Sequence, residues 1–150
     1  MIVFERKVFR MVDNSGLKRK LAQIQRKITA ALTARMEKYA AELVAEMKAL
    51  VPVESGALRD SIGWTWGDKP KGSMGIVTVK GRDTEGFFIT IYAGTRDKSL
   101  GDRDAFYARM QEFGTKNHKA NPFFYPVWRS NRRRIRSGLT REIKKAVKSI

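Results

Sequence analysis

The sequence contains no cysteine among its 150 residues, so it forms no disulfide bond and offers no thiolate for catalysis or metal binding. It also lacks any apolar run approaching the ~18 residues that a membrane-spanning helix needs. The first ten residues, MIVFERKVFR, are charged throughout and have no apolar signal core or small-residue cleavage site. Hydrophobic residues make up 42% of the chain and aromatic residues 10%, enough for one domain with its own core. We therefore expect a soluble globular protein, for which an intracellular site of assembly is permitted.

Groups that carry out catalysis are also scarce. His118 is the single histidine, and its place between lysines in TKNHKANP is typical of a surface residue. The acidic loop with Asp97, Asp102 and Asp104 departs from EF-hand spacing and interleaves Lys and Arg, so it does not predict a cation site. The segment ESGA at 54–57 lacks the Gly-x-Ser-x-Gly frame, and no glycine-rich phosphate loop is present. We expect no catalytic residues and no cofactor, and a hydrolase built on the acidic loop and His118 is the weakest alternative.

Acidic residues are few relative to basic ones, and the formal net charge is +16. The excess lies at the ends, because residues 1–36 carry +7, residues 37–128 carry +1 and residues 129–150 carry +8. Clustered Lys and Arg side chains attract phosphate. The candidate phosphate contacts are Arg132, Arg133, Arg134, Arg136, Lys144 and Lys145.

These charges leave two interpretations open. On a helix the arginines fan around the axis and form no single edge that reads DNA bases, and the patterns of RRM, C₂H₂ and helix-turn-helix domains are absent. A sequence-independent nucleic-acid-binding protein is therefore an alternative function. Solvated helix faces that only keep the protein in solution explain the same charges.

Apolar residues recur every three or four positions in the first third of the chain, which predicts a long helix. The stripe consists of Leu17, Leu21, Ile24, Ile28, Leu32, Met36, Tyr39, Leu43, Met47 and Leu50. Asp13, Asn14 and Ser15 are N-cap candidates, and Pro52 ends the helix. A helix of ~35 residues is about 50 Å long. Because this exceeds what one small sheet can cover, we expect part of it to project or to pack against another subunit. The alternative is a kink or break that gives two shorter helices, although the run contains no Gly or Pro to cause one.

The middle of the chain predicts a small sheet. Three segments, at 62–66, 75–81 and 87–94, alternate apolar and polar residues and are rich in β-branched and aromatic side chains. Their short links predict an antiparallel meander of three to four strands. Before them, Ser55 is a cap candidate for a short helical turn with Leu58 and Ile62 facing inward.

Two further helices complete the expected fold. AFYARMQEFG reads as a short helix with Phe106, Met110 and Phe113 on one side. A basic C-terminal helix follows Pro126, with an apolar stripe of Val127, Trp128, Ile135, Leu139, Ile143 and Val147. We expect one α+β domain over 1–150. It divides into an N-terminal arm (1–15), a long helix (16–51), the sheet with short helices (52–128) and the basic helix (129–150).

Two segments together resemble a known family. VPVESGALRDSI at 51–62 is similar to its VPVDTGALRRSI-type element, and YARMQEFGT with KANPFFYPVW, within 107–128, is similar to its YAxxxEFGTxxxxARPFLRPA-type element. Their order and separation match the head–tail joining family of long-tailed bacteriophages, whose members are also called tail-completion or tail-terminator proteins. The resemblance covers residues 17–148. Asn121 stands where the family has a basic residue, and the loop at 95–104 is an insertion; both fall at exposed turns.

The resemblance implies a structural protein of the virion neck, assembled in the cytoplasm of the host bacterium. Such proteins form a ring, usually six-fold, that caps the tail tube and docks onto the head-closure (stopper) protein of the connector. The family has no enzymatic activity and needs no cofactor. Contact with the genomic DNA that passes through the ring is a further expectation.

The same resemblance selects the residues that we expect to pack the fold or to contact a neighbour. We expect Gly114 to end the short helix in a left-handed turn, and Pro122 and Pro126 to stiffen PFFYP as an extended arm. Phe123 is a core candidate, whereas Phe124 and Tyr125 are candidates for core or interface. The full set of candidates is Pro52, Gly56, Leu58, Tyr107, Glu112, Phe113, Gly114, Pro122, Phe123, Phe124, Tyr125 and Pro126.

Overall fold

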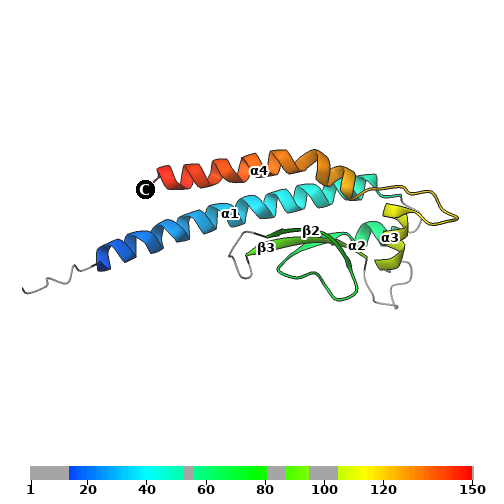
Figure 1. Cartoon of the computed structure of the whole chain (residues 1–150), viewed down its shortest axis with the longest axis horizontal. Coiled ribbons are helices and arrows are strands. Elements are labelled where there is room, and N and C mark those ends of the chain that lie inside the picture. Colours follow the sequence, from blue (N-terminus) through cyan, green and yellow to red (C-terminus); the bar gives the residue numbers. More distant parts are fainter. Residues whose placement is uncertain (1–13, 53–55, 81–86, 95–104, 150) are drawn as a thin grey trace, which may run out of the picture.

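The computed structural model describes residues 14–52, 56–80, 87–94 and 105–149. The helices are α1 (Ser15–Leu50), α2 (Ala57–Ser61), α3 (Ala105–Phe113) and α4 (Tyr125–Lys148), and the strands are β1 (Gly63–Trp66), β2 (Met74–Lys80) and β3 (Phe88–Ala93). Long helix, small antiparallel sheet, short helix and basic C-terminal helix follow in the expected order (Figure 1). The predicted α+β class is confirmed.

Helix α1 runs unbroken for 36 residues, or about 54 Å at 1.5 Å per residue. Its buried residues all belong to the C-terminal half, beginning at Tyr39 and ending at Met47. Leu17 and Leu21, on the same apolar stripe, are 58% and 55% exposed. The N-terminal half projects beyond the sheet (Figure 1), so the stripe is longer than the core that it serves.

The sheet corrects one prediction. The three strands are antiparallel to their neighbours, but their order is β1-β3-β2, so they do not form a meander. Strand β3 lies at the centre, with both of its edges paired, and both of its faces are covered: Ile89 and Ile91 are buried against the helices, and Thr90 is buried on the other face. The link from β1 to β2, residues 67–73, is long enough to pass β3.

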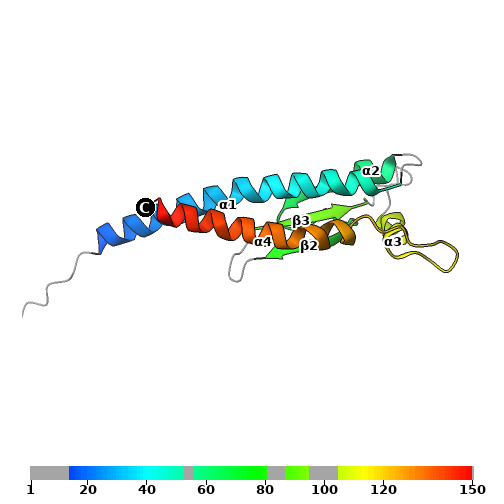
Figure 2. The same ribbon diagram turned by 90° about the horizontal axis from the view of Figure 1, so that it is seen from above.

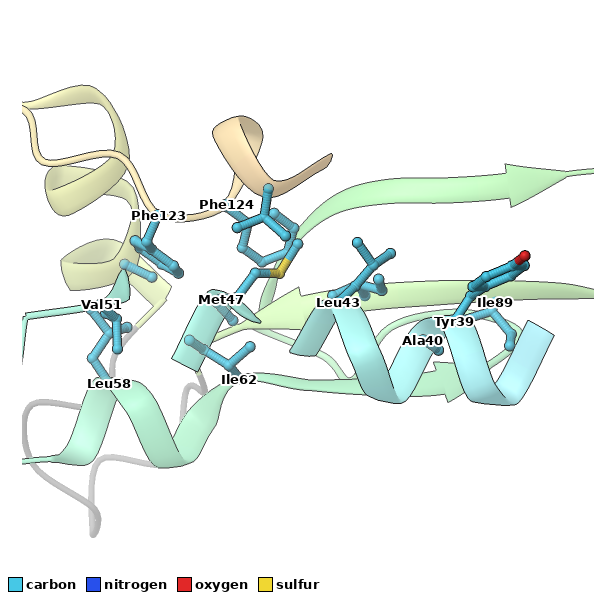
Figure 3. Packing of buried hydrophobic residues seen from close by; sticks show 14 of the residues in the cluster. Tyr39, Ala40, Leu43, Met47, Val51, Leu58, Ile62, Ile89, Phe123 and Phe124 are labelled. Atoms are coloured by element: carbon cyan, nitrogen blue, oxygen red, sulfur yellow. The ribbon is translucent and has the colours of Figure 1, made fainter. Parts of the chain in front are cut away.

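Helices α1 and α4 lie antiparallel, side by side, over one face of the sheet (Figure 2). Trp64 pairs with Ile91 and Trp66 with Ile89, so all four side chains belong to the face that meets the helices. The core continues past the sheet, where Met47, Phe123 and Phe124 are completely buried (Figure 3). The core therefore joins α1, the sheet and the start of α4.

Helix α4 begins earlier than predicted, at Tyr125 instead of residue 129, and Pro126 lies in its first turn. A proline is tolerated there because the first N–H groups of a helix have no intrahelical acceptor. The expected extended PFFYP arm is therefore wrong at its C-terminal end. The predicted cap Ser55 lies outside the described residues; Gly56, with φ 76°, precedes α2.

Candidate functional site

The carboxylate of Glu112 holds the start of α4. Its Oε2 accepts hydrogen bonds from the backbone N–H groups of Phe123 (2.9 Å) and Phe124 (3.0 Å), and its Oε1 accepts one from that of Tyr125 (2.9 Å). Glu112 is only 4% exposed. A carboxylate is favoured at this position because three orphan N–H groups and the helix dipole converge on it. The Glu-Phe-Gly element thus fixes where the last helix begins.

Gly114 makes the turn that follows α3. Its N–H donates to the Met110 carbonyl (2.7 Å), and its φ of 73° is left-handed, which is the usual glycine exit from a helix. A Cβ here would lie 2.8 Å from the Ala120 nitrogen and 2.9 Å from the His118 oxygen. The chain therefore needs glycine both for the torsion angle and for the close approach of residues 118–120. This confirms the expected left-handed end of the short helix.

The aromatic residues of PFFYP separate into core and surface. Phe123 and Phe124 pack edge to face, 5.8 Å between ring centroids, and both are 0% exposed. Tyr125 is half-buried, with its ring 5.9 Å from that of Phe113 and the Arg129 guanidinium 5.8 Å from it. Phe113 itself is 58% exposed, although the sequence pattern placed it with Met110.

Large apolar side chains therefore gather on the surface where α1 ends and α4 begins. Leu50, 54% exposed, lines an open groove with Pro126, and Tyr125 joins Pro126 to the exposed ring of Phe113. We call this surface the end patch, and it comprises Leu50, Phe113, Tyr125 and Pro126. Sequence reasoning selected the last three but missed Leu50, which it assigned to the core stripe of α1.

The described residues of the Pro-x-x-x-Gly-Ala-Leu segment are buried or half-buried at the end of the molecule that carries the end patch. Leu58 is buried, Pro52 and Gly56 are half-buried, and Tyr107 receives a hydrogen bond from Gln111 Nε2 (3.3 Å). Ser61, not singled out from the sequence, accepts the Gly94 N–H (2.9 Å) and donates to the Leu58 carbonyl (2.7 Å). Ser61 could have been selected from the sequence because it is a serine in the last turn of a short helix, where a hydroxyl often bonds to a nearby backbone group.

Two of the six candidate phosphate contacts, Arg134 and Lys145, form ion pairs within the chain. Arg134 donates to Glu42 Oε2 (2.8 Å) and Asn131 Oδ1 (2.8 Å), and lies over the ring of Tyr39. This arginine therefore ties α4 to α1. Of the other five candidates, Lys145 approaches Glu142 at 3.5 Å. All five are exposed: Arg132, Arg133, Arg136, Lys144 and Lys145.

The weaker alternatives gain no support from the described residues. His118 is exposed and its backbone pairs with that of Thr115 in a tight turn. Asp97, Asp102 and Asp104 lie outside the described residues. In the part of the chain that the structure describes, no group of His and acidic side chains could hold a metal ion, and no helix is long and apolar enough to cross a membrane.

Comparison with known protein families identifies the family of this chain. Residues 15–114, from the start of α1 to the Gly114 turn, match the HK97-gp10-like family, described as "Bacteriophage HK97-gp10, putative tail-component". The chain belongs to this family. It is a structural component of a bacteriophage tail, is part of the virion, and has other tail proteins as its partners. No curated protein and no solved structure matches the chain.

Proposed function

We propose that this tail component forms a ring at the neck of the virion, where it ends the tail tube and joins the tail to the head-closure protein. The resemblance of its two sequence elements to the head–tail joining family supports this place, and six subunits are the expected number. The protein acts by packing and docking, with no catalytic step and no cofactor.

The observation that carries the proposal is the presence of two separate apolar surfaces on one elongated subunit. The end patch, which includes Leu50 and Phe113, lies at the end of the molecule that carries α3 (Figure 1). The second set, which we call the arm seam, lies toward the other end and consists of Leu17 and Leu21 near the start of α1 and Ile143 and Val147 near the end of α4. Each of these four side chains is between 39% and 58% exposed.

Two different surfaces on one subunit favour a head-to-tail contact between copies. Such a heterologous contact produces a closed ring when the rotation between neighbours closes. Burying exposed leucine, isoleucine and phenylalanine side chains stabilises the contact by roughly 25 cal/mol per Å² of apolar area removed from water. The Glu112 carboxylate serves this docking by holding the backbone of Phe123, Phe124 and Tyr125, which fixes the position of Tyr125 in the end patch.

The decisive experiment is electron microscopy of particles made without this protein. The proposal predicts DNA-filled heads lying apart from tails, and tails of irregular length, because neither the tube end nor the joint is capped. Intact particles, or empty and malformed heads, would contradict the neck position while leaving the family assignment untouched.

A matched pair of variants tests the ring. Phe113→Asp places a charge in the end patch and should abolish assembly on purified tail tubes. Lys116→Asp changes an exposed residue three positions away and should leave assembly intact. Equal assembly by both variants would exclude the end patch as a contact surface.

A further inference from the structure

The parts of the two basic ends that the structure describes, on α1 and α4, lie near each other. The N-terminal half of α1 and the C-terminal turns of α4 lie alongside each other beyond the sheet (Figures 1 and 2). We call this region, together with the preceding turns of α4 that pack on the sheet, the arm and define it as residues 15–35 and 132–148. It contains fourteen Lys and Arg side chains and one acidic residue, Glu142.

The acidic residues of α1 lie outside the arm, and their carboxylates form hydrogen bonds or ion pairs within the fold. Glu37 accepts the Trp66 indole N–H (3.0 Å), Glu42 pairs with Arg134 (2.8 Å), and Glu46 accepts from the Asn131 amide (2.6 Å). Helix α1 is therefore divided into a half with acids that contact the fold and a half with only basic charges. Among the described residues, only Arg134, with Glu42 and Glu46, and Lys145, with Glu142, form ion pairs in the arm, so most of its charge is not balanced within the fold.

Most of the basic side chains of the arm are available to a partner. Arg35 and Arg134 lie over the ring of Tyr39, at 4.8 and 5.5 Å from its centroid. The other twelve are exposed, namely Lys18, Arg19, Lys20, Arg26, Lys27, Arg132, Arg133, Arg136, Arg141, Lys144, Lys145 and Lys148. Like charges along two adjacent helices repel each other, and this repulsion falls when a polyanion replaces the counterions.

We infer that the arm binds double-stranded DNA through its phosphate backbone. The α4 part of the arm is about 25 Å long and carries eight basic residues, and a duplex presents one phosphate charge per ~1.7 Å, or ~15 over that length, so every basic side chain has a phosphate within reach. Arginine supplies five of the eight basic residues in this part of α4, and its planar fork suits phosphate oxygens. Because the charges surround the helices, we expect binding without base sequence preference.

An acidic protein fits this surface less well. Protein interfaces need a core of apolar side chains from which water is excluded, whereas these twelve exposed residues are charged and spread over two helices. The exposed apolar residues of the arm form the arm seam, which the ring proposal assigns to a neighbouring subunit. The argument against an acidic protein rests in part on the ring proposal, whereas the DNA-binding experiment uses the purified full-length protein and needs no ring.

The experiment measures fluorescence anisotropy of a labelled duplex of about 30 bp over a series of salt concentrations. If six or more phosphates are contacted, affinity should fall about 10³-fold between 50 and 200 mM salt. A scrambled duplex of the same length should bind equally. Polyglutamate of equal charge should compete much less well than unlabelled DNA.

Matched triple variants locate the site. Lys18, Arg19 and Lys20→Gln, and separately Arg132, Arg133 and Arg136→Gln, should each weaken binding about tenfold or more. Each should also flatten the salt dependence, by roughly one unit of slope for every phosphate that is no longer neutralised. Lys71, Lys116 and Lys119→Gln removes the same charge from exposed positions outside the arm and should change affinity less than about twofold.

Three results would overturn the inference. They are no binding at 50 mM salt, an equal decrease of affinity in the arm and control variants, or equal competition by polyglutamate, which would assign the surface to an acidic protein. Circular dichroism of each variant establishes that it is folded. Absence of DNA binding with normal neck assembly, or the reverse, would separate this inference from the ring proposal.

Discussion

Gly138 of α4 lies directly against the phenol ring of Tyr39 of α1. A Cβ at this position would overlap the tyrosine hydroxyl and come within 2.9 Å of Cζ. Both residues are buried, and they sit where the two long helices pack side by side. The missing side chain is therefore what lets α4 approach α1, and the ion pair of Arg134 with Glu42 lies one turn away.

Gly138→Ala should destabilise the protein although alanine is the better helix former. The overlap costs about 1–3 kcal/mol, which exceeds the ~1 kcal/mol that alanine gains over glycine inside a helix. Urea unfolding measures the difference. Gly16→Ala, with no atom within 4 Å of its Cβ, is the control and should be neutral or stabilising. Adding Tyr39→Phe should recover part of the stability that Gly138→Ala removes; no recovery would place the clash elsewhere.

Glu112→Gln should loosen the start of α4. The amide keeps one acceptor oxygen but turns an N–H₂ group toward backbone N–H donors, which leaves buried donors unpaired at about 1–3 kcal/mol each. The midpoint of thermal unfolding should fall accordingly. Glu142→Gln, a change at a weakly paired residue of the same type, should alter stability by less than ~0.5 kcal/mol. Equal effects would contradict the anchoring role of Glu112.

Gly114→Ala and Gly67→Ala form a second matched pair. Both glycines have positive φ, 73° and 77°, so both substitutions carry the left-handed torsion penalty of roughly 1–2 kcal/mol. Only Gly114 has backbone atoms within 3 Å of the added Cβ, whereas Gly67 has nothing within 4 Å. Gly114→Ala should therefore be the more damaging change in urea unfolding. Equal destabilisation would show that residues 118–120 move aside freely.

Phe123→Ala and Phe113→Ala should affect different properties. Phe123 is completely buried, so its truncation should cost about 3–5 kcal/mol of stability. Phe113 is 58% exposed, so its truncation should leave the monomer's stability within ~0.5 kcal/mol and weaken assembly on tail tubes. A large decrease in stability for Phe113→Ala would mean that it is a core residue.

Local sequence patterns were sufficient to predict where the long helix and the strands lie. Apolar spacing from Leu17 to Leu50 predicted one long helix, and α1 spans Ser15–Leu50. Alternating β-branched residues located all three strands to within about a residue or two. These features follow from periodicity along the chain, which the sequence displays directly.

The arrangement of those helices and strands could be determined only from the three-dimensional structure. Strand order, the early start of α4 at Tyr125 and the pairing of Arg134 with Glu42 all depend on contacts between residues distant in sequence. The same holds for Phe113 and Leu50, whose apolar character predicted burial and whose exposure follows from where α3 and α1 end.

The class of the fold, the phage-tail family and the residues of the Glu-Phe-Gly and Pro-Phe elements could all be predicted from the amino-acid sequence. The roles of those residues became clear from the folded chain. Folding brings the Glu112 carboxylate to three N–H groups of residues 123–125, and it places the basic residues of α1 alongside those of α4. Helix periodicity is a local property of the chain, whereas convergence of charges and donors depends on long-range packing, which a single sequence does not display.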